Sequence, residues 1–233
     1  MLNHLIEQLP DNLQPLLAHN WSKLESQVLT MATPPDVFIN DLARVLTGSD
    51  YVAAQCSRNT GLLAELLASG DLYRGYLPGR YMQSLAECLA SVDSEPLLQL
   101  RLREFRQREM VRIVWRDLTR QADMRETTRD LSALADACID QALRWLYAEC
   151  CNKWGTPHSR AHEGQPALPQ QLVVLGMGKL GANELNLSSD IDLIFAYPEK
   201  GETAGGGRCL ANQDFFSRLG QKLIQALDNI TAE

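Results

Sequence analysis

The amino-acid sequence predicts an α+β protein that is predominantly helical. An all-helical domain is expected over residues 1–151, and a smaller domain with a small mixed sheet over residues 171–233. Apolar residues recur at helical spacing through nearly all of the first segment, whereas the second opens with short apolar runs rich in branched residues, which favour strands. Residues 152–170 have no periodicity and contain two glycines and three prolines, so we expect a linker there.

Composition excludes several classes of protein. The 233 residues are 45% hydrophobic and carry a net charge of −7, which is typical of a globular protein and argues against nucleic-acid binding through bulk charge. No apolar run approaches the roughly 18 residues needed to span a bilayer, and the first residues lack the features of a signal peptide. We therefore expect a cytoplasmic protein without a membrane partner.

Turn and capping residues divide the first segment into helices. Thr33–Asp36 has turn chemistry, Gly48–Asp50 ends one helix and caps the next, and Ser69–Gly70 ends another. Residues 73–80 are expected to form a loop, followed by a helix over 81–91. These boundaries predict several short helices before residue 94.

A long helix is expected to begin at Ser94, with Pro96 in its first turn. Its apolar positions predict a buried face formed by Leu98, Leu102, Phe105, Met110, Ile113 and Val114. Six arginines accompany that face, namely Arg101, Arg103, Arg106, Arg108, Arg112 and Arg116. Such arginines are typical of a solvated helix face, or of a surface that docks another domain or an acidic partner. Glu104 lies four residues before Arg108 and is expected to pair with it. Another helix is expected over residues 127–151.

The second segment predicts two strands and a helix. Strands are expected over Gln171–Leu175 and Ile191–Tyr197, and a helix over Asn212–Asp228. The glycine-rich residues 199–208 indicate a hairpin or loop.

A glycine pattern follows the first of these strands. Gly176, Gly178 and Gly181 satisfy GxGxxG, which alone would indicate a dinucleotide-binding turn. Only nine positions separate Gly181 from Asp190, which is too few for the crossover helix that such a fold requires. The dinucleotide interpretation is therefore disfavoured.

The second strand begins with an acidic pair. Because side chains alternate along a strand, Asp190 and Asp192 should share one face while Ile191, Leu193 and Phe195 point into the core. Two such carboxylates can hold divalent ions of the kind used in phosphoryl transfer, and hard oxygen ligands favour Mg²⁺ or Mn²⁺. The glycine turn and Lys179 could receive a phosphate. Two surface aspartates without function would leave the glycine turn unexplained.

A glycine turn followed by a DxD strand resembles the polymerase-β-like nucleotidyltransferase superfamily. The string GMGKLGANELNLSSDIDLIF at residues 176–195 more closely resembles one family within it, the bifunctional glutamine synthetase adenylyltransferase and adenylyl-removing enzymes. The resemblance extends to residues 50–56, 102–118 and 131–136, so it covers most of the chain.

The resemblance implies an activity and partners. Members of this family carry two nucleotidyltransferase domains in tandem, and the residues ELN and SDIDLIF are similar to the N-terminal one. This similarity implies removal of AMP from a tyrosine of glutamine synthetase by phosphorolysis, giving ADP. Glutamine synthetase, a PII-type signal protein, nucleotide and phosphate are the implied partners, and control of nitrogen assimilation is the implied role.

The resemblance also implies six site residues. They are the metal-binding Asp190 and Asp192, the phosphate-seating Gly176 and Gly178, and the supporting Lys179 and Ser189. Superfamily members complete the metal site with a third carboxylate on a later strand. We therefore expect that carboxylate beyond Glu233, and a 233-residue chain that is catalytically incomplete by itself.

Two alternatives remain open at this point. The chain could be a non-catalytic helical module that docks glutamine synthetase or a PII-type regulator, or a nucleotidyltransferase with another acceptor. The sequence leaves the preferred metal, the docking segment and the oligomeric state open.

Overall fold

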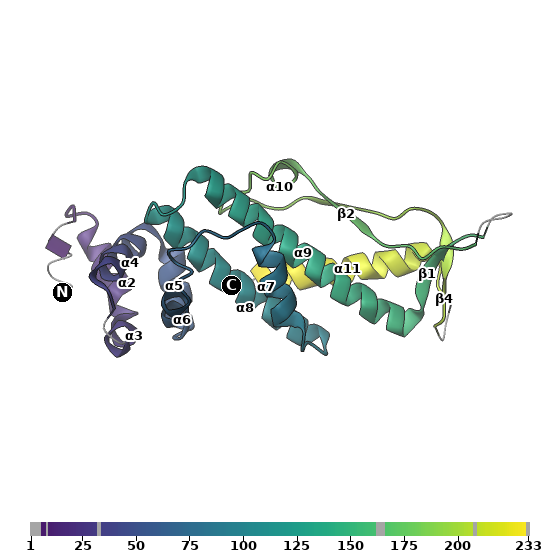
Figure 1. Ribbon diagram of the computed structural model, residues 1–233, viewed down its shortest axis with the longest axis horizontal. Helices are drawn as coiled ribbons and strands as arrows, with labels where there is room; N and C mark the ends of the chain where they lie inside the picture. Colours follow the sequence, from purple (N-terminus) through teal and green to yellow (C-terminus); the bar gives the residue numbers. More distant parts are fainter. Residues whose placement is uncertain (1–5, 8, 32–33, 162–165, 207–208, 232–233) are drawn as a thin grey trace. The chain divides into compact units, whose positions relative to one another are not determined.

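The computed structural model describes residues 6–7, 9–31, 34–161, 166–206 and 209–231. Helices dominate this part of the chain, as predicted, and the strands are short (Figure 1). The helices are α2 (Gln14–Ser22), α3 (Glu25–Thr30), α4 (Asp36–Gly48), α5 (Asp50–Arg58), α6 (Leu62–Ser69), α7 (Arg80–Leu89), α8 (Glu95–Leu118), α9 (Met124–Trp154), α10 (Gly178–Gly181) and α11 (Asn212–Thr231). The strands are β1 (Thr156–Ser159), β2 (Val173–Gly176), β3 (Leu193–Ala196) and β4 (Gly201–Ala204).

Local sequence explains where several helices begin and end. The Ser49 hydroxyl caps α5 by accepting a hydrogen bond of 3.3 Å from the Val52 amide, as its place before Asp50 predicts. Gly70 ends α6 in the left-handed conformation with a φ of 73°, which glycine adopts without steric strain. The predicted boundaries of these helices are confirmed.

The chain divides into two compact units. The first comprises residues 1–77 and 107–130, and the second comprises residues 78–106 and 131–233, so the boundary passes within α8 and within α9.

An apolar cluster from several helices forms the core of the first unit. Phe38 of α4 stacks on Trp115 of α8 with ring centroids 5.3 Å apart. Both rings are almost fully buried, together with leucines of α2, α4 and α6 and with Val52, Ala53 and Cys56 of α5. Burial of this surface is the main term that stabilises the unit.

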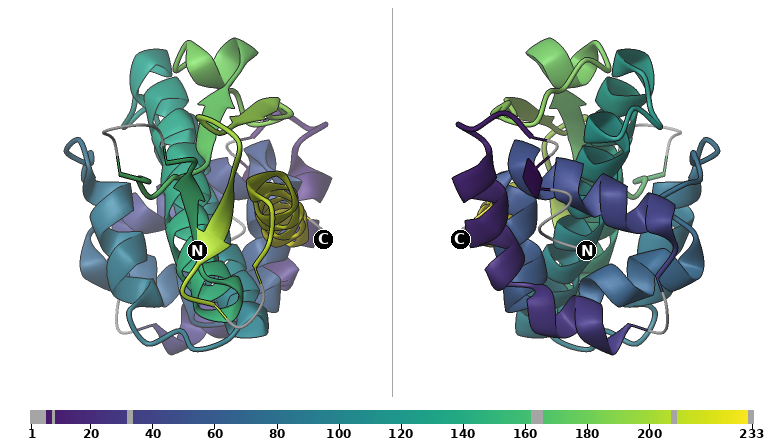
Figure 2. Two further views of the ribbon diagram at one scale, coloured as in Figure 1. Left: turned by 90° about the vertical axis from the view of Figure 1, so that its right-hand side faces the viewer. Right: turned by 90° about the vertical axis from the view of Figure 1, so that its left-hand side faces the viewer.

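In the second unit, α11 packs beside the last turns of α9 (Figure 2). Phe215 of α11 contacts Tyr147 and Trp154 edge to face, with centroids 6.0 and 6.2 Å apart. The Asn212 side chain at the start of α11 donates a hydrogen bond of 2.9 Å to the His158 carbonyl of β1. Aromatic packing and this amide therefore hold α11 against α9 and β1.

The strands form two antiparallel pairs, β1 with β4 and β2 with β3. No pair among the described strands is parallel, so the single mixed sheet that we expected is not what these residues form. β1 lies in the segment expected to be a linker, and β4 lies in the segment expected to be a hairpin or loop.

No helix in the described ranges combines the length and apolar character needed to cross a bilayer.

Candidate functional site

The pairing of β2 with β3 brings the glycine turn and the acidic pair together. In this register Gly176 lies opposite Leu193, at the end of both strands. One residue further on, the Met177 amide donates a hydrogen bond of 2.9 Å to the Asp192 carbonyl. The turn that follows β2 therefore begins directly beside the residues that precede β3.

The glycines are required by close approach of the chain to itself. A Cβ atom on Gly181 would lie 2.6 Å from the Gly176 carbonyl oxygen, which is backbone and cannot give way. A Cβ on Gly176 would lie 2.8 Å from the Leu180 side chain, and Gly178 has a φ of 54°, in the region that favours glycine. The turn is therefore tight, with Gly178 and Lys179 exposed on its outer side.

The acidic pair lies before β3, whereas we predicted it within the strand. β3 begins at Leu193, and Ile191 is 42% exposed where we expected a buried side chain. The reason is that β2 ends at Gly176, so residues before Asp192 have no strand to pair with. Asp190 and Asp192 are both exposed, and strand alternation does not place them on a common face.

Lys179 and Ser189, the two residues expected to be supporting contacts, lie close together. The Lys179 ammonium lies 3.5 Å from the Ser189 hydroxyl. This hydroxyl donates to the Asn186 side-chain oxygen at 2.6 Å and accepts from the Asn186 amide at 3.2 Å. Asn186 was missed by the sequence analysis, although its position three residues before a serine is typical of a side-chain-stabilised turn.

A buried serine of α9 anchors this loop. The Leu185 amide donates a hydrogen bond of 3.2 Å to the Ser132 hydroxyl, and both residues are almost fully buried. Ser132 was also missed, although a serine within the apolar pattern Leu131–Ala135 could have indicated a buried polar contact. Two views at right angles to each other both show the β2–β3 pair and α10 beside α9 (Figures 1 and 2).

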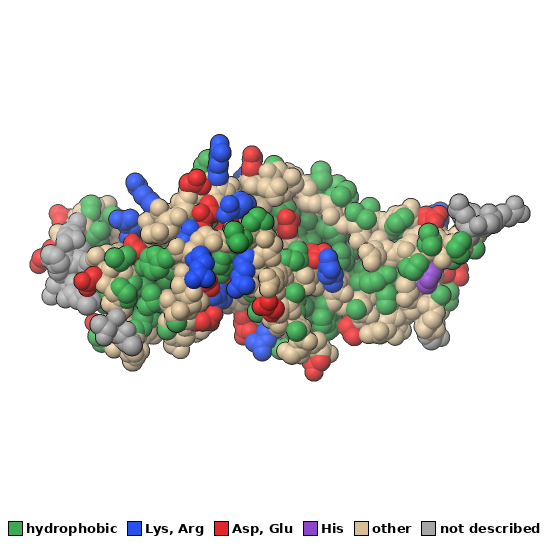
Figure 3. All heavy atoms as spheres, viewed as in Figure 1, with side chains coloured by type: hydrophobic (Ala, Val, Ile, Leu, Met, Phe, Trp, Pro, Cys, Tyr) green, Lys and Arg blue, Asp and Glu red, His purple; other side chains and the backbone are tan. Residues whose placement is uncertain are grey.

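One face of the β2–β3 ribbon is apolar and half exposed. The exposed fractions of Val173, Leu175 and Ile194 lie between 46% and 48%. Green hydrophobic side chains are visible over β2 in Figure 3, which has the viewpoint of Figure 1. The predicted strands therefore exist, but β2 is not buried on both faces.

The acidic pair fits a divalent cation in part. Magnesium sites commonly use one or two carboxylates together with substrate phosphates and water, and both aspartates are open to solvent. Within the described ranges no three His, Cys, Asp or Glu side chains gather closely enough to hold a metal ion. Asp190 and Asp192 could therefore hold Mg²⁺ or Mn²⁺ only with further oxygen ligands.

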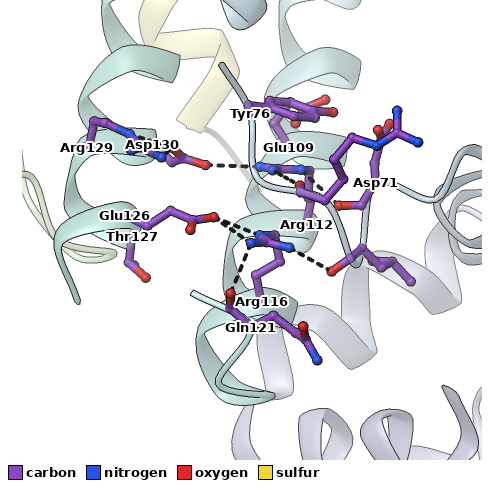
Figure 4. Close-up of polar contacts among 12 residues, drawn as sticks. Asp71, Tyr76, Glu109, Arg112, Arg116, Gln121, Glu126, Thr127, Arg129 and Asp130 are labelled. Atoms are coloured by element: carbon purple, nitrogen blue, oxygen red, sulfur yellow. Dashed lines mark hydrogen bonds and ion pairs between the residues drawn. The ribbon is translucent and has the colours of Figure 1, made fainter. Parts of the chain in front are cut away.

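Arg112 and Arg116 of α8 lie in a second polar cluster, in the first unit (Figure 4). Arg112 is 0% exposed, and its guanidinium donates to Asp130 Oδ2 at 3.1 Å and to the carbonyls of Arg74 at 2.7 Å and Asp71 at 3.2 Å. Its Cζ atom lies 3.4 Å from the centre of the Tyr76 ring. Each edge of this guanidinium is thus occupied by an internal partner.

Arg116 is buried in a similar way. It donates to Glu126 Oε1 at 2.7 and 3.0 Å, to the Gln121 carbonyl at 3.1 Å and to the Leu72 carbonyl at 3.4 Å. For Arg112 and Arg116, the prediction of a solvated or docking face is therefore wrong. Their spacing on α8 turns them toward α9 and residues 71–76, where their carboxylate and carbonyl partners lie.

Arg108 differs from its predicted pairing. It donates to Glu65 Oε1 at 2.7 Å and to Asp71 Oδ2 at 2.6 Å, and it also contacts Glu109. Glu104 pairs with Arg101 at 2.8 Å. The predicted pair between Glu104 and Arg108 was wrong because tertiary partners outcompete a surface pair along the helix.

Burial shifts the titration of this cluster. It raises the pKa of Glu109 despite the nearby Arg108 and Arg112, and Glu109 Oε2 has no hydrogen-bond partner among the described residues. Burial alone would also raise the pKa of Asp71, but hydrogen bonds from Arg108 and Ser69 outweigh it, so this pKa lies below its ordinary 3.8.

Comparison with known proteins gives consistent matches. A family model described as glutamate-ammonia ligase adenylyltransferase matches residues 39–233. Proteins described as bifunctional glutamine synthetase adenylyltransferase/adenylyl-removing enzyme are 49% identical in Pseudomonas aeruginosa, 47% in Pseudomonas putida and 46% in Nitrosococcus oceani. Each alignment covers 98% of this chain and 23–24% of the relative. The chain thus spans about a quarter of the length of these relatives.

Proposed function

The chain belongs to the glutamate-ammonia ligase adenylyltransferase family, and from that premise we propose that it supplies the adenylyl-removing site of such an enzyme. The proposed reaction removes AMP from a tyrosine of glutamine synthetase by phosphorolysis. The observation that carries the proposal is the β2–β3 register, because it sets the glycine turn directly against Asp192. Residues 171–233 would form the corresponding part of a nucleotidyltransferase core.

The reaction balances without a further reactant. An oxygen of inorganic phosphate attacks the phosphorus of the AMP group, the bond from that phosphorus to the tyrosine oxygen breaks, and the phenolate takes a proton. The products are ADP and free tyrosine. Since little covalent chemistry is required of the protein, positioning and charge stabilisation dominate.

Each site residue has a role that matches its position. The main chain at Gly176 and Gly178 would seat phosphate, and the Lys179 ammonium would offset its negative charge. Ser189, held by Asn186, would keep Lys179 in place.

Asp190 and Asp192 would hold a divalent cation. When bound, such an ion would neutralise charge that develops on the phosphate oxygens. The half-exposed apolar face of β2 and β3 leaves room for further protein to complete the core.

Two features support the adenylyl-removing half. The residues ELN and SDIDLIF are similar to the N-terminal copy of the domain in this family. A helical segment precedes them here, as helices precede that copy in the family. The alternative of a docking module drew on the arginines of α8, and three of them, Arg108, Arg112 and Arg116, are engaged by internal partners. Glutamine synthetase is therefore the proposed substrate, and a PII-type regulator is a further proposed partner.

The test is release of ADP from adenylylated glutamine synthetase in the presence of phosphate and Mg²⁺ or Mn²⁺. It is measured for the 233-residue chain and for a longer polypeptide that contains it. In the active polypeptide Asp192→Asn should lower turnover by about 100-fold or more, since a carboxamide keeps the shape but removes the charge that holds a cation.

Asp214→Asn, an exposed aspartate of α11, is the matched control and should leave turnover unchanged. Near-normal turnover of Asp192→Asn with ordinary metal dependence would refute the assignment of the acidic pair.

A further inference from the structure

Two arginines of the first unit border an open hollow of about 560 Å³. Among the described residues its lining consists of Arg44 on α4, Leu118 at the end of α8, and Arg120 just beyond it. This volume is in the range of small-molecule sites. The hollow contains none of the residues assigned above to catalysis.

Arg44 and Arg120 differ from the internal arginines of α8. Arg108, Arg112 and Arg116 have their guanidinium groups occupied by carboxylates and carbonyls, whereas neither Arg44 nor Arg120 forms an ion pair with another described residue. The charge of Arg44 acts on the Asp41 carboxyl without forming an ion pair with it; Tyr73 donates a hydrogen bond to that carboxyl, and its Oδ2 has no hydrogen-bond partner among the described residues. The guanidinium groups of Arg44 and Arg120 thus lie at the edge of one hollow without an ion-pair partner among the described residues.

The backbone at Arg120 is unusual for an arginine. Its φ is 59°, in the left-handed region, at the position after a helix where glycine is preferred. The Arg120 amide donates to the Asp117 carbonyl at 3.0 Å and the Gln121 amide to the Arg116 carbonyl at 2.8 Å, which is the hydrogen-bond pattern of a Schellman cap. Arg120 therefore occupies a position where glycine would fit the backbone with less strain.

The ends of α4 and α8 pack closely at Leu118, which lines the hollow. A Cβ on Gly48 would lie 3.1 Å from a methyl group of Leu118, so the absence of a side chain lets these two helix ends approach closely. Both arginines are carried on or next to this contact. Their positions are thus set by elements of the core and not by a free loop.

We propose that Arg44 and Arg120 form a binding site for a small molecule that carries a phosphate monoester. Guanidinium groups match phosphate oxygens through paired, charge-assisted hydrogen bonds, and arginine is the side chain best suited to this geometry. The charged lining disfavours an apolar ligand. This site does not depend on the function proposed for the glycine turn.

The test follows side-chain Nε–H signals of arginine by NMR in the 233-residue chain. Inorganic phosphate, glycerol 3-phosphate, succinate and glycerol are titrated separately at constant ionic strength. Signals that disappear in Arg44→Gln and in Arg120→Gly identify the two residues. We expect both signals to shift saturably with the two phosphate compounds, with a Kd on the order of 1 mM, and not with glycerol.

Each variant should weaken binding about tenfold, because each removes charge-assisted hydrogen bonds to the ligand. Arg58→Gln, which alters another exposed arginine of the same unit, should leave binding unchanged. Lys179→Gln should also have no effect, which separates this site from phosphate bound at the glycine turn.

Several outcomes would overturn the proposal. Equal, non-saturating shifts of Arg58, Arg44 and Arg120 would show only ionic screening. Saturation by succinate and not by the phosphates would reject the ligand class. A lower melting temperature of Arg120→Gly without a change in phosphate binding would show that Arg120 serves only to balance the dipole of α8.

Discussion

Removing one partner of the buried pair between Arg112 and Asp130 should destabilise the protein strongly. The two side chains are 0% and 5% exposed, and Asp130 is the carboxylate that accepts from the Arg112 guanidinium at 3.1 Å. Asp130→Ala removes the carboxylate that pairs with this buried guanidinium, while its contacts with the Asp71 and Arg74 carbonyls remain. Breaking a buried pair in this way costs about 3–5 kcal/mol, which is a large share of the roughly 5–15 kcal/mol that stabilises a typical domain.

The assay is urea unfolding at neutral pH, followed by circular dichroism, for Asp130→Ala, Arg112→Met and the double variant. Because the two residues are in direct contact, the double variant should lose less than the sum of the single losses, with a coupling energy of about 1–3 kcal/mol. Arg112→Met also removes the guanidinium donor from the carbonyls of Asp71 and Arg74. It should therefore lower the free energy of unfolding at least as much as Asp130→Ala does.

The matched control lies on the same helix. Asp140 pairs with Arg144 at 2.6 Å, but these side chains are 36% and 72% exposed. Asp140→Ala should therefore cost no more than about 0.5 kcal/mol. If Asp130→Ala destabilises no more than Asp140→Ala does, the reasoning from burial is refuted.

Three further outcomes follow from single contacts. The pKa of Asp71 is lowered in the folded state, so its carboxylate stabilises the fold at pH values above its ordinary pKa of 3.8. This contribution is lost as the pH falls through the lowered pKa. The difference in unfolding free energy between wild type and Asp71→Asn should therefore become smaller in acid, as acid unfolding curves can show. Gly181→Ala should destabilise the chain by about 1–3 kcal/mol in thermal unfolding, because its Cβ would meet a carbonyl oxygen; Gly61→Ala, whose Cβ would make only an ordinary contact of 4.0 Å with the Asn59 side chain, should cost much less. Burial raises the pKa of the Cys56 thiol to about 12, so iodoacetamide should modify the exposed Cys88 first and Cys56 only on unfolding, as mass spectrometry of the peptides can show.

Helix ends and apolar faces were predictable because they depend on neighbours in the sequence. Ser49 and Gly70 act on amides and carbonyls within a few residues, and the buried face of α8 follows its own periodicity. The start of β3 was not predictable in this way. Whether Ile191 belongs to a strand depends on where the partner strand ends, and the end at Gly176 is a property of the pair.

The partners of the α8 arginines were also not predictable from the sequence, because they too depend on residues far along the chain. A helical arginine pattern is identical whether the arginines meet water, a partner protein or their own chain, since the periodicity states only which side chains share a face. The deciding partners of Arg112 are Asp130 and the carbonyls of Asp71 and Arg74, which lie 18, 41 and 38 positions away. By contrast, the candidate site could be proposed from sequence because its glycine turn and its acidic pair both lie in the connection between two consecutive, paired strands. The motif encodes both strands and the turn between them, so its geometry needs no distant partner except Ser132, the contact that the sequence analysis missed.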